Sequence, residues 1–158
     1  MSSLKRSILI CSFLFLELLI SSLAFSQSLK TFDTPEKALL ALEDAYRNQD
    51  IEAAIAATDF PAAAQLSFKG LNEMASKDSE IFKQMVDILE LSFRKDIADN
   101  GYPNFTGAIC EVSDKKMRSD ETAALYESCK FANGATSEQV LLAHRKEDGW
   151  RIIGLEQQ

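Results

Sequence analysis

The spacing of apolar residues changes once along this chain, at the segment Asn-Gly-Tyr-Pro that spans residues 100–103. Before this segment the apolar residues recur every three or four positions, which is the period of an α-helix. After it they alternate, which is the period of a β-strand. Helices followed by strands with short connections predict an α+β domain. We therefore expect N-terminal helices packed on a curved, antiparallel, four-stranded meander.

Helix signals mark the first half of the chain. Residues 34–36 read Thr-Pro-Glu, a capping hydroxyl followed by proline and a first-turn carboxylate, so a helix is expected from there to about Asn48. Asp50 is placed to cap a short alanine-rich helix, and a weaker helical pattern covers residues 61–75. The clearest apolar stripe runs through residues 79–99, and we expect this long helix to form the centre of the core.

Strand signals mark the second half. The connections between the alternating segments are short and polar, and two of them contain Asn-Gly or Asp-Gly pairs, which are typical of hairpin turns. Sequential strands joined in this way pair as antiparallel neighbours. The four predicted strands cover residues 105–113, 122–132, 139–146 and 150–155.

The chain opens with a segment that is typical of a secretory signal peptide. Two basic residues precede an apolar run over residues 8–25, and small residues occupy the positions that a signal peptidase reads. We expect cleavage of residues 1–26, which leaves a single α+β domain over residues 27–158 in the periplasm or outside the cell. An uncleaved membrane anchor is the alternative, disfavoured because Glu17 would lie near the middle of the bilayer.

Two of the three cysteines, Cys110 and Cys129, lie in the expected mature domain. The polar segment 118–121 lies midway between them and is the expected turn of a hairpin. Symmetric strand pairing about this turn places Cys110 directly opposite Cys129, and such a pair in an oxidising compartment predicts a structural disulfide. Neither a metal site nor a cofactor is expected, because the spacing is not Cys-x-x-Cys and companion cysteine or histidine ligands are missing.

The chain is acidic, with 17 basic and 24 acidic residues and a formal net charge of −7. Removal of residues 1–26 takes away two basic residues and one acidic residue, which leaves 15 and 23 and a net charge of −8. A phosphate backbone needs a basic surface, so a nucleic-acid partner is not expected, and neither is a membrane partner after cleavage. The charge favours a basic ligand or a basic protein partner, although solubility alone also explains it.

Three short stretches carry a resemblance to a known family: Thr-Pro-Glu-Lys-Ala at residues 34–38, Asn-Gln-Asp-Ile-Glu-Ala-Ala at 48–54 and Asp-Gly-Trp-Arg-Ile at 148–152. In these stretches, and in layout over residues 32–156, the chain resembles the NTF2-like superfamily of cone-shaped α+β domains, in the branch with many small secreted bacterial proteins. The resemblance implies a sheet that curls around a long helix and leaves a pocket at the open end of the cone. A different α+β fold is the alternative, because the helical half is longer than a minimal member needs.

A pocket of this kind has four candidate lining residues in this chain. His144 is the only histidine, and it shares one face of the third expected strand with Val140 and Leu142. For each candidate, core packing or a hydrogen bond within the sheet is the competing interpretation. Glu43 and Asp44 are adjacent on the first helix and diverge by about 100°, so we expect them on a solvated face. The candidate binding residues are Tyr46, Tyr126, His144 and Trp150.

No motif of a known catalytic mechanism occurs in the sequence, including G-x-S-x-G, H-E-x-x-H, the P-loop and G-x-G-x-x-G. The first hypothesis is an exported, non-catalytic binding module for a protein or small-molecule partner; small acidic exported proteins include immunity proteins that neutralise toxins. The alternative is a small enzyme that uses a pocket carboxylate or His144 as general base. A buried carboxyl or histidine with a shifted pKa beside a tyrosine would favour the enzyme. A homodimer formed through the sheet is a further hypothesis.

Overall fold

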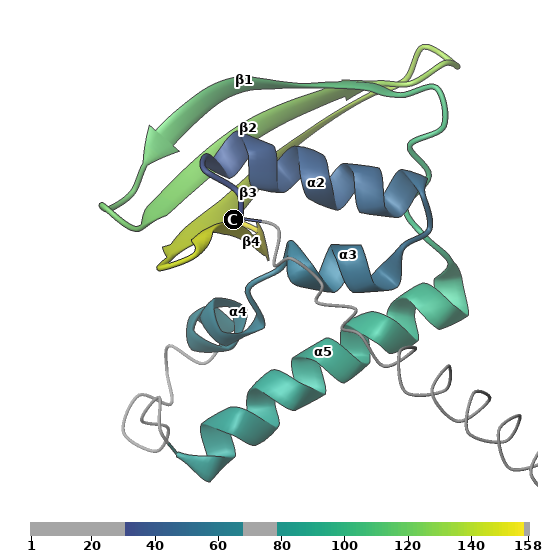
Figure 1. Cartoon of the computed structure of the whole chain (residues 1–158). Coiled ribbons are helices and arrows are strands. Elements are labelled where there is room, and N and C mark those ends of the chain that lie inside the picture. Colours follow the sequence, from purple (N-terminus) through teal and green to yellow (C-terminus); the bar gives the residue numbers. More distant parts are fainter. Residues whose placement is uncertain (1–30, 68–78, 157–158) are drawn as a thin grey trace, which may run out of the picture.

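The computed structural model describes residues 31–67 and 79–156 (Figure 1). The predicted signal peptide, residues 1–26, lies outside the described residues, as does part of the weak helical pattern at 61–75. Four described helices precede four strands, which confirms the α+β class and the element order expected from the sequence. The helices are α2 (Pro35–Arg47), α3 (Ile51–Ala56), α4 (Phe60–Ser67) and α5 (Glu80–Asn100), and the strands are β1 (Ile109–Met117), β2 (Thr122–Lys130), β3 (Thr136–Lys146) and β4 (Gly149–Leu155).

The four strands form one antiparallel sheet in the order β1-β2-β3-β4, as a meander requires. The sheet curves over α2, and the other helices lie beneath it (Figure 1). The outer edge of β4 is covered by backbone hydrogen bonds: Trp150 N donates to Phe32 O at 2.7 Å, Ile152 N donates to Ala57 O at 2.8 Å, and Asp59 N donates to Ile152 O at 2.8 Å. This pairing removes a free strand edge and ties the start of the domain to its end.

Side-chain caps fix where three helices begin. The side chains of Thr34, Asp50 and Ser79 each accept a hydrogen bond from the backbone N–H three residues further on, at 3.2, 2.9 and 3.1 Å. Each bond satisfies a donor that the first turn of a helix leaves without a partner. The helix starts predicted at these three positions are confirmed.

The core lies between the sheet and the helices α2 and α3. Small side chains occur on both surfaces, Ala38 and Ala45 on α2 and Ala123 and Ala143 in the sheet, and they let the helix lie close to the strands. The buried cluster consists of Phe32, Ala38, Leu39, Leu42, Ala45, Ala54, Ala57, Ala123, Leu125, Leu141, Ala143, Trp150 and Ile152.

The expectation that the helix at residues 79–99 forms the centre of the core is wrong. Helix α5 does cover these residues, but Phe82 is its one buried side chain, and Leu91 is 67% exposed. Helices α2 and α3 occupy the position against the sheet, so α5 packs against α4 at the periphery. None of the described helices is long and apolar enough to cross a membrane.

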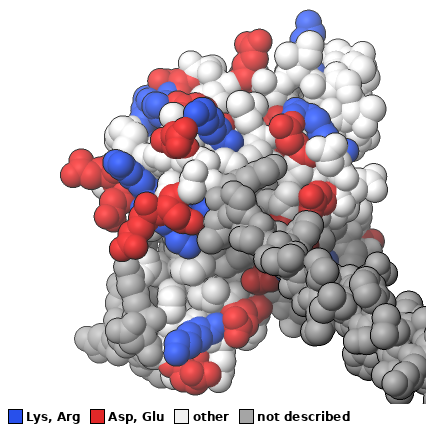
Figure 2. Space-filling view, in the orientation of Figure 1, with Lys and Arg blue, Asp and Glu red and all other residues white. Residues whose placement is uncertain are grey.

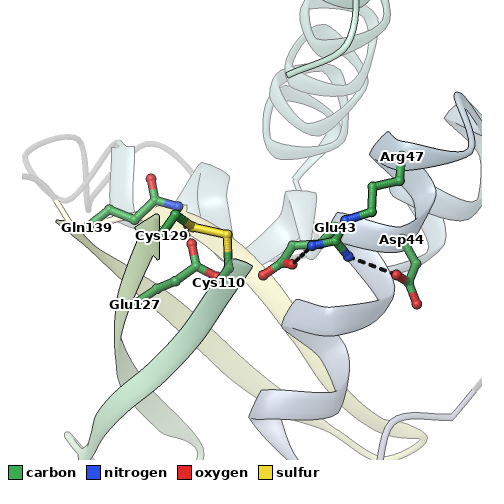
Figure 3. Close-up of a disulfide and its surroundings, with 7 residues drawn as sticks. All are labelled: Glu43, Asp44, Arg47, Cys110, Glu127, Cys129 and Gln139. Atoms are coloured by element: carbon green, nitrogen blue, oxygen red, sulfur yellow. Dashed lines mark hydrogen bonds and ion pairs between the residues drawn. A yellow bond between two sulfur atoms is a disulfide. The ribbon is translucent and has the colours of Figure 1, made fainter. Parts of the chain in front are cut away.

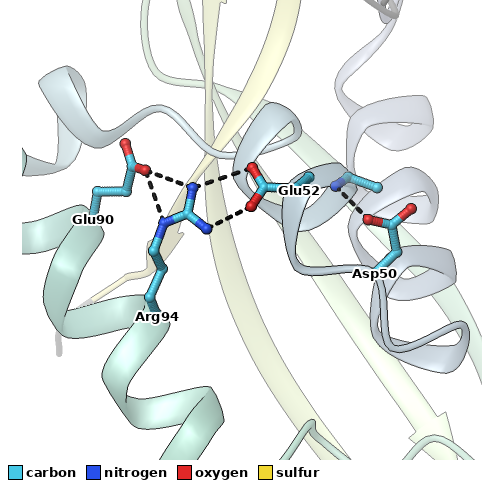
Figure 4. A network of polar contacts seen from close by, with 5 residues as sticks. Asp50, Glu52, Glu90 and Arg94 are labelled. Atoms are coloured by element: carbon cyan, nitrogen blue, oxygen red, sulfur yellow. Dashed lines mark hydrogen bonds and ion pairs between the residues drawn. The ribbon is translucent and has the colours of Figure 1, made fainter.

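Arg94 connects α5 to α3 (Figure 4). Its guanidinium donates two hydrogen bonds to Glu52, at 2.6 and 3.1 Å, and two to Glu90, at 2.9 and 3.0 Å. The hydrogen bonds to Glu52 and then to Glu90 raise the pKa of Arg94 above its ordinary value. Because all three side chains reach solvent, this network contributes little to stability.

The predicted disulfide is confirmed: Cys110 and Cys129 are Cα partners in the β1–β2 ladder and their sulfurs are bonded. Symmetric pairing about the segment 118–121 makes the numbers of paired residues sum to 239. Near the turn they sum to 240 instead, as in Met117 with Ala123. A β-bulge at Ser113 then shifts the register by one residue, and the cysteines meet as expected. The Ser113 hydroxyl donates to the carbonyl oxygen of Tyr126 at 3.1 Å and supports the bulge.

The first strand begins at Ile109 rather than at residue 105. Residues 102–108 form a loop instead, because Asn104 accepts a hydrogen bond from Thr106 N at 2.9 Å and Gly107 adopts a φ of 68°. Local side-chain bonds of this type compete with strand pairing. The loop is therefore free to build one wall of a cleft.

A candidate binding cleft at the end of helix α2

A cleft of about 610 Å³ lies between the C-terminal end of α2 and the loop 102–108. The helix end contributes Tyr46, Arg47 and Gln49, and every residue of the loop lines the opposite side. The chain leaves α2 through Gln49, which has a positive φ of 55°, and this turn exposes the last helical side chains to the cleft. The volume lies within the range of small-molecule sites.

Aromatic rings form the apolar wall of the cleft. The Tyr46 ring is stacked with Phe105 at a centroid distance of 6.2 Å and meets Tyr102 at 6.4 Å with a 60° tilt. On its other side Tyr46 contacts Phe93 of α5 at 6.5 Å and packs against the core. Offset and tilted ring pairs of this kind are favourable, so Tyr46 anchors the loop to the helix.

Arg47 is the cation of the cleft. Its guanidinium donates to Glu43 at 2.6 Å and to Asp44 at 2.9 Å, and its central carbon lies 5.6 Å from the centre of the Phe105 ring. Although partial burial opposes the charge, these two hydrogen bonds raise the pKa of Arg47 above its ordinary value. Arg47 is therefore a permanent cation held in one orientation by two carboxylates and a ring face.

The cleft offers hydrogen-bonding groups but no proton acceptor for neutral pH. Burial, and then the charge of Asp96, raise the pKa of Tyr46 to about 12, so its hydroxyl keeps its proton. Among the described residues that line the cleft there is no aspartate, glutamate or histidine. The arrangement can stack a planar group and hydrogen-bond its edges.

A pair of buried carboxyl groups lies behind Arg47. Glu43 on α2 and Glu127 on β2 are each 3% exposed, and the two side chains face each other across the helix–sheet interface (Figure 3). Gln139 of β3 donates to one oxygen of Glu127 at 2.6 Å. The other oxygen, Oε1, has no hydrogen-bond partner in the described part of the chain.

Burial and this pairing change the acidity of Glu43. Burial comes first, followed by the hydrogen bond and the charge of Glu127, and together they raise the pKa of Glu43 to about 7 against the opposing effect of Arg47. The expectation that Glu43 lies on a solvated face is therefore wrong, whereas Asp44 is exposed as expected. Adjacent side chains on a helix point in different directions, and here it is the side chain of Glu43 that points to the core.

The disulfide borders this carboxyl pair. The two sulfurs and an oxygen of Glu127 all lie within 4.8 Å of one another, which resembles a metal-ligand cluster in spacing. Because the sulfurs are bonded to each other, no thiolate is present to hold an ion. The cluster is a disulfide with a buried acid beside it.

The structure places the four sequence-predicted residues in different environments. Tyr46 lines the cleft. Trp150 is 7% exposed and belongs to the core cluster. Tyr126 lies on the face of β2 opposite Leu125 and Glu127, and the Lys116 ammonium lies 4.7 Å from its ring centre. These residues are thus not brought together in one cavity.

His144 is held by a buried aspartate. Its Nδ1 lies 2.8 Å from Oδ2 of Asp59, which is 2% exposed, while Oδ1 of Asp59 accepts a hydrogen bond from Ala62 N, the third residue of α4. A carboxylate only accepts, so Nδ1 donates and neutral imidazole keeps its lone pair on Nε2, 4.0 Å from Glu121. Asp59 thus caps a helix and fixes the imidazole at once.

His144 and the cleft lie at opposite ends of β2. His144 pairs with Thr122, the first residue of that strand, whereas the strand that follows the cleft loop begins opposite Lys130, the last residue. Eight residues of strand separate the two positions, roughly 26 Å. The imidazole therefore does not serve the cleft.

Sequence reasoning missed three groups of the site. Phe105 was expected in a strand that begins at residue 105 and Tyr102 in the break between the two halves, so neither they nor Arg47 indicated a cleft. Glu127 carried a signal, since it alternates with Leu125 and Cys129 and so lies on the buried face of β2. The sequence gives no corresponding signal for the burial of Glu43, because a charged residue on a helix is most often solvated.

The surface outside the cleft shows no single-sign patch on the face in Figure 2, where acidic and basic side chains alternate. Interspersed charges of this kind favour solubility rather than one defined electrostatic partner.

Comparisons with known proteins give one structural likeness. No protein-family model matches the chain, and no curated protein matches it in sequence. A Campylobacter jejuni protein, whose crystal structure at 2.00 Å is described as that of a putative NTF2-like transpeptidase, aligns with 77% of this chain and 98% of its own. The sequence identity is 12% and the TM-score is 0.40, and a match at this level assigns neither a family nor an activity.

Proposed function

We propose that the mature chain, residues 27–158, is an exported binding module without a catalytic centre, and that it holds a small molecule with a planar body in the cleft at the end of α2. The observation that carries the proposal is the lining of this cleft. Three aromatic rings and one fixed guanidinium surround about 610 Å³, and the described lining residues include no acid or base that titrates near neutral pH. Such a site recognises shape and edge hydrogen bonds.

Each part of the lining has a role in this proposal. The ligand stacks on Tyr102 and Phe105, which belong to the loop, while Tyr46 supports them from the core side. The Tyr46 hydroxyl and the N–H groups of Arg47 bind polar atoms at the edge of the ligand. Aromatic side chains give large contact areas with few rotatable bonds, so little conformational entropy is lost on binding.

The proposed location is the periplasm or the outside of the cell. The leader over residues 1–26 and the Cys110–Cys129 disulfide support export, because disulfides persist in oxidising compartments. An immunity-type protein that holds a protein partner at the same surface is the second form of this proposal. The aromatic lining of the cleft favours the small molecule.

The proposal is tested by nuclear magnetic resonance titration of residues 27–158 with two planar probes, neutral 2-naphthol and anionic naphthalene-2-sulfonate. We expect saturable shifts of the amides of residues 102–108 for at least one probe. Tyr102→Ala and Phe105→Ala should weaken binding about tenfold or more, since each removes a stacking surface. Tyr126→Ala is the matched control, because it removes a ring from the opposite face of the sheet.

The outcomes separate the alternatives. Shifts that are confined to the loop, and lost in the two loop variants alone, support a small-molecule site. Shifts that are equally strong in Tyr102→Ala and in wild type place binding elsewhere and contradict the proposal. An intact module that ignores both probes but retains a protein from its own periplasm or medium would indicate the immunity-type form.

A small enzyme with His144 as general base is the second candidate. The supporting observation is the 2.8 Å contact with buried Asp59, which orients the imidazole and leaves Nε2 facing outward. A positioned imidazole of this kind is a competent base. If the enzyme is correct, hydrolysis of p-nitrophenyl acetate will fall at least tenfold in His144→Gln. Equal rates in the variant and in wild type contradict it.

The homodimer through the sheet stays a prediction. The dimer contact in this hypothesis is a face of the four-stranded sheet. Sedimentation with and without reductant tests the oligomeric state and its dependence on the disulfide together.

A further inference from the structure

The disulfide and the buried carboxyl pair lie against each other, and the cleft uses neither of them (Figure 3). Glu127 and Cys129 are two residues apart on β2, so both side chains face the helices. An oxygen of Glu127 lies within 4.8 Å of both sulfurs. This is within reach of direct proton transfer after a small side-chain movement.

The two sulfurs differ in exposure. Cys129 is 2% exposed, whereas Cys110 on the edge strand β1 is half-buried and is the sulfur that an external thiol can approach. A thiolate released at Cys129 would be an anion in an apolar interior, which is costly unless a proton arrives with it. Among the described residues Oε1 of Glu127 has no hydrogen-bond partner, so this buried oxygen is open to a proton shared within the carboxyl pair.

We propose that the Cys110–Cys129 disulfide exchanges with an external dithiol, and that the Glu43–Glu127 carboxyl pair donates the proton to the sulfur that leaves. The pair is then the general acid of a reducible disulfide. This inference does not depend on the ligand cleft.

The exchange proceeds in balanced steps. A thiolate of the dithiol attacks Sγ of Cys110, the S–S bond breaks, and its electron pair leaves on Sγ of Cys129. The carboxyl pair transfers its proton to Cys129 and later regains one from water. The second thiol of the dithiol, as thiolate, then attacks the reductant's own sulfur in the mixed disulfide, which closes a cyclic disulfide and releases Cys110 as a thiolate. The Cys110 thiolate takes its proton from solvent. Two electrons pass from the dithiol to the protein.

The acidity of the pair suits this transfer. The pKa of Glu43 is raised to about 7, by burial first and then by Glu127, whereas a cysteine thiol has a pKa of about 8.5 that burial raises further. Proton transfer from the carboxyl to the thiolate is therefore downhill. The other groups that face the pair are Arg47 from α2, which also binds the exposed Asp44, the neutral Gln139 from β3 and the disulfide that joins β1 to β2.

The test is reduction of the folded module by dithiothreitol between pH 5.5 and 8.5, with acid quenching and mass analysis of free thiols. Rate constants are divided by the fraction of the reductant present as thiolate, which removes the pH dependence of the attacking group. For wild type we expect this corrected rate constant to fall as pH rises through about 7, because the pair loses its proton.

Two variants complete the test. Glu43→Gln/Glu127→Gln keeps the size and hydrogen bonding of the pair but removes its acidic proton, and should be reduced at least about tenfold more slowly at pH 6, with a flat corrected profile. Glu111→Gln is the matched control: it makes one of the same substitutions beside Cys110, on the opposite face of β1, and should behave as wild type.

A double variant as fast as wild type at pH 6 overturns the proposal, and so does a wild-type corrected rate that does not depend on pH. Reduction that accelerates steeply in dilute urea also overturns it, because the disulfide would then open only through global unfolding. If the double variant does not fold, as judged by circular dichroism, the wild-type profile and its urea dependence still decide the matter.

Discussion

Glu43 and Asp44 are neighbours on α2, yet their carboxyl groups have different surroundings. The side chain of Glu43 is 4% exposed and faces Glu127, whereas that of Asp44 is 66% exposed, and Arg47 binds both. One residue of helical rotation separates an interior acid from a surface one. The difference becomes measurable when pH changes.

Glu43→Gln is expected to change the pH dependence of stability. The pKa of Glu43 is about 7 in the folded protein and 4.5 ordinarily, so the folded state binds the proton more tightly than the unfolded state. Wild-type stability therefore falls as pH rises from about 4.5 to 7, by roughly 3 kcal/mol in total. The amide does not titrate, so the variant gains this amount relative to wild type, measured by urea unfolding at several pH values.

Asp44→Asn is the control for this measurement, because it makes the same type of change one residue away, at an exposed position. It should follow the wild-type slope. Parallel pH curves for wild type and Glu43→Gln would show that Glu43 ionises in the folded protein as it does in the unfolded chain, and would contradict a proton held between Glu43 and Glu127.

Asp59→Ala tests the residue that joins α4 to the sheet. The substitution removes a helix cap and leaves His144 without its partner, so the free energy of unfolding should fall by about 2–3 kcal/mol. Asp50→Ala removes an exposed cap whose side chain has no second hydrogen-bond partner among the described residues, and it should cost about 1 kcal/mol. Equal losses in the two variants would contradict the dual role of Asp59.

At the scale of elements, local sequence signals predicted whether a segment is a helix or a strand better than they predicted where a strand begins. The caps at Thr34 and Asp50 could be predicted because capping depends on neighbouring residues only. The helix that begins after Ser79 was predicted from its apolar stripe rather than from its cap. A strand was expected from residue 105 because Phe105 fits an alternating pattern, but the turn at Asn104 and the positive φ of Gly107 place residues 105–108 in the loop. Alternation alone does not distinguish a strand from a loop with its own hydrogen bonds.

The position of α5 could not be predicted from its apolar stripe. The stripe gives a helix and a face, but not which of several amphipathic helices lies against the sheet. The alanine-rich surfaces of α2 and α3 pack against the sheet, and Ile88 and Leu91 of α5 are exposed. Competition between helices for one sheet face is a property of the whole chain.

Hydrogen exchange should reveal how lightly α5 is attached. Its contacts with the rest of the described chain are chiefly to α4, with the exposed Arg94 network to α3. We expect amide protection in the middle of α5 to be about tenfold or more below that of α2 and β2, because local opening of α5 exposes little apolar surface. Equal protection in α5 and β2 would contradict its peripheral position.

At the scale of the whole molecule, the disulfide closes the β1–β2 hairpin across a sequence separation of 19 residues. A Cys110→Ala/Cys129→Ala variant should lose about 3 kcal/mol of unfolding free energy, as expected for a loop of this size. Urea unfolding of oxidised wild type and of this variant at equal pH measures the loss. A variant as stable as wild type would show that the cross-link does not restrict the unfolded chain.

The sequence predicted much of the fold but little of the candidate site. The cysteine pairing and the element order follow from spacing and period, which are local properties of the chain. The cleft depends on Tyr46 and Phe105, 59 positions apart in sequence, meeting at a helix end, and only the assembled fold brings them together. Trp150, a natural ligand-stacking candidate, fills the core instead.

Native mass spectrometry of the protein released from its own secretory compartment examines export, cross-linking and ligand retention in one experiment. We expect a chain that begins near Gln27, carries the disulfide, and retains a small-molecule adduct that Phe105→Ala loses and Tyr126→Ala keeps. A full-length chain with free thiols, or an adduct that survives in Phe105→Ala, would contradict the proposed exported binding module.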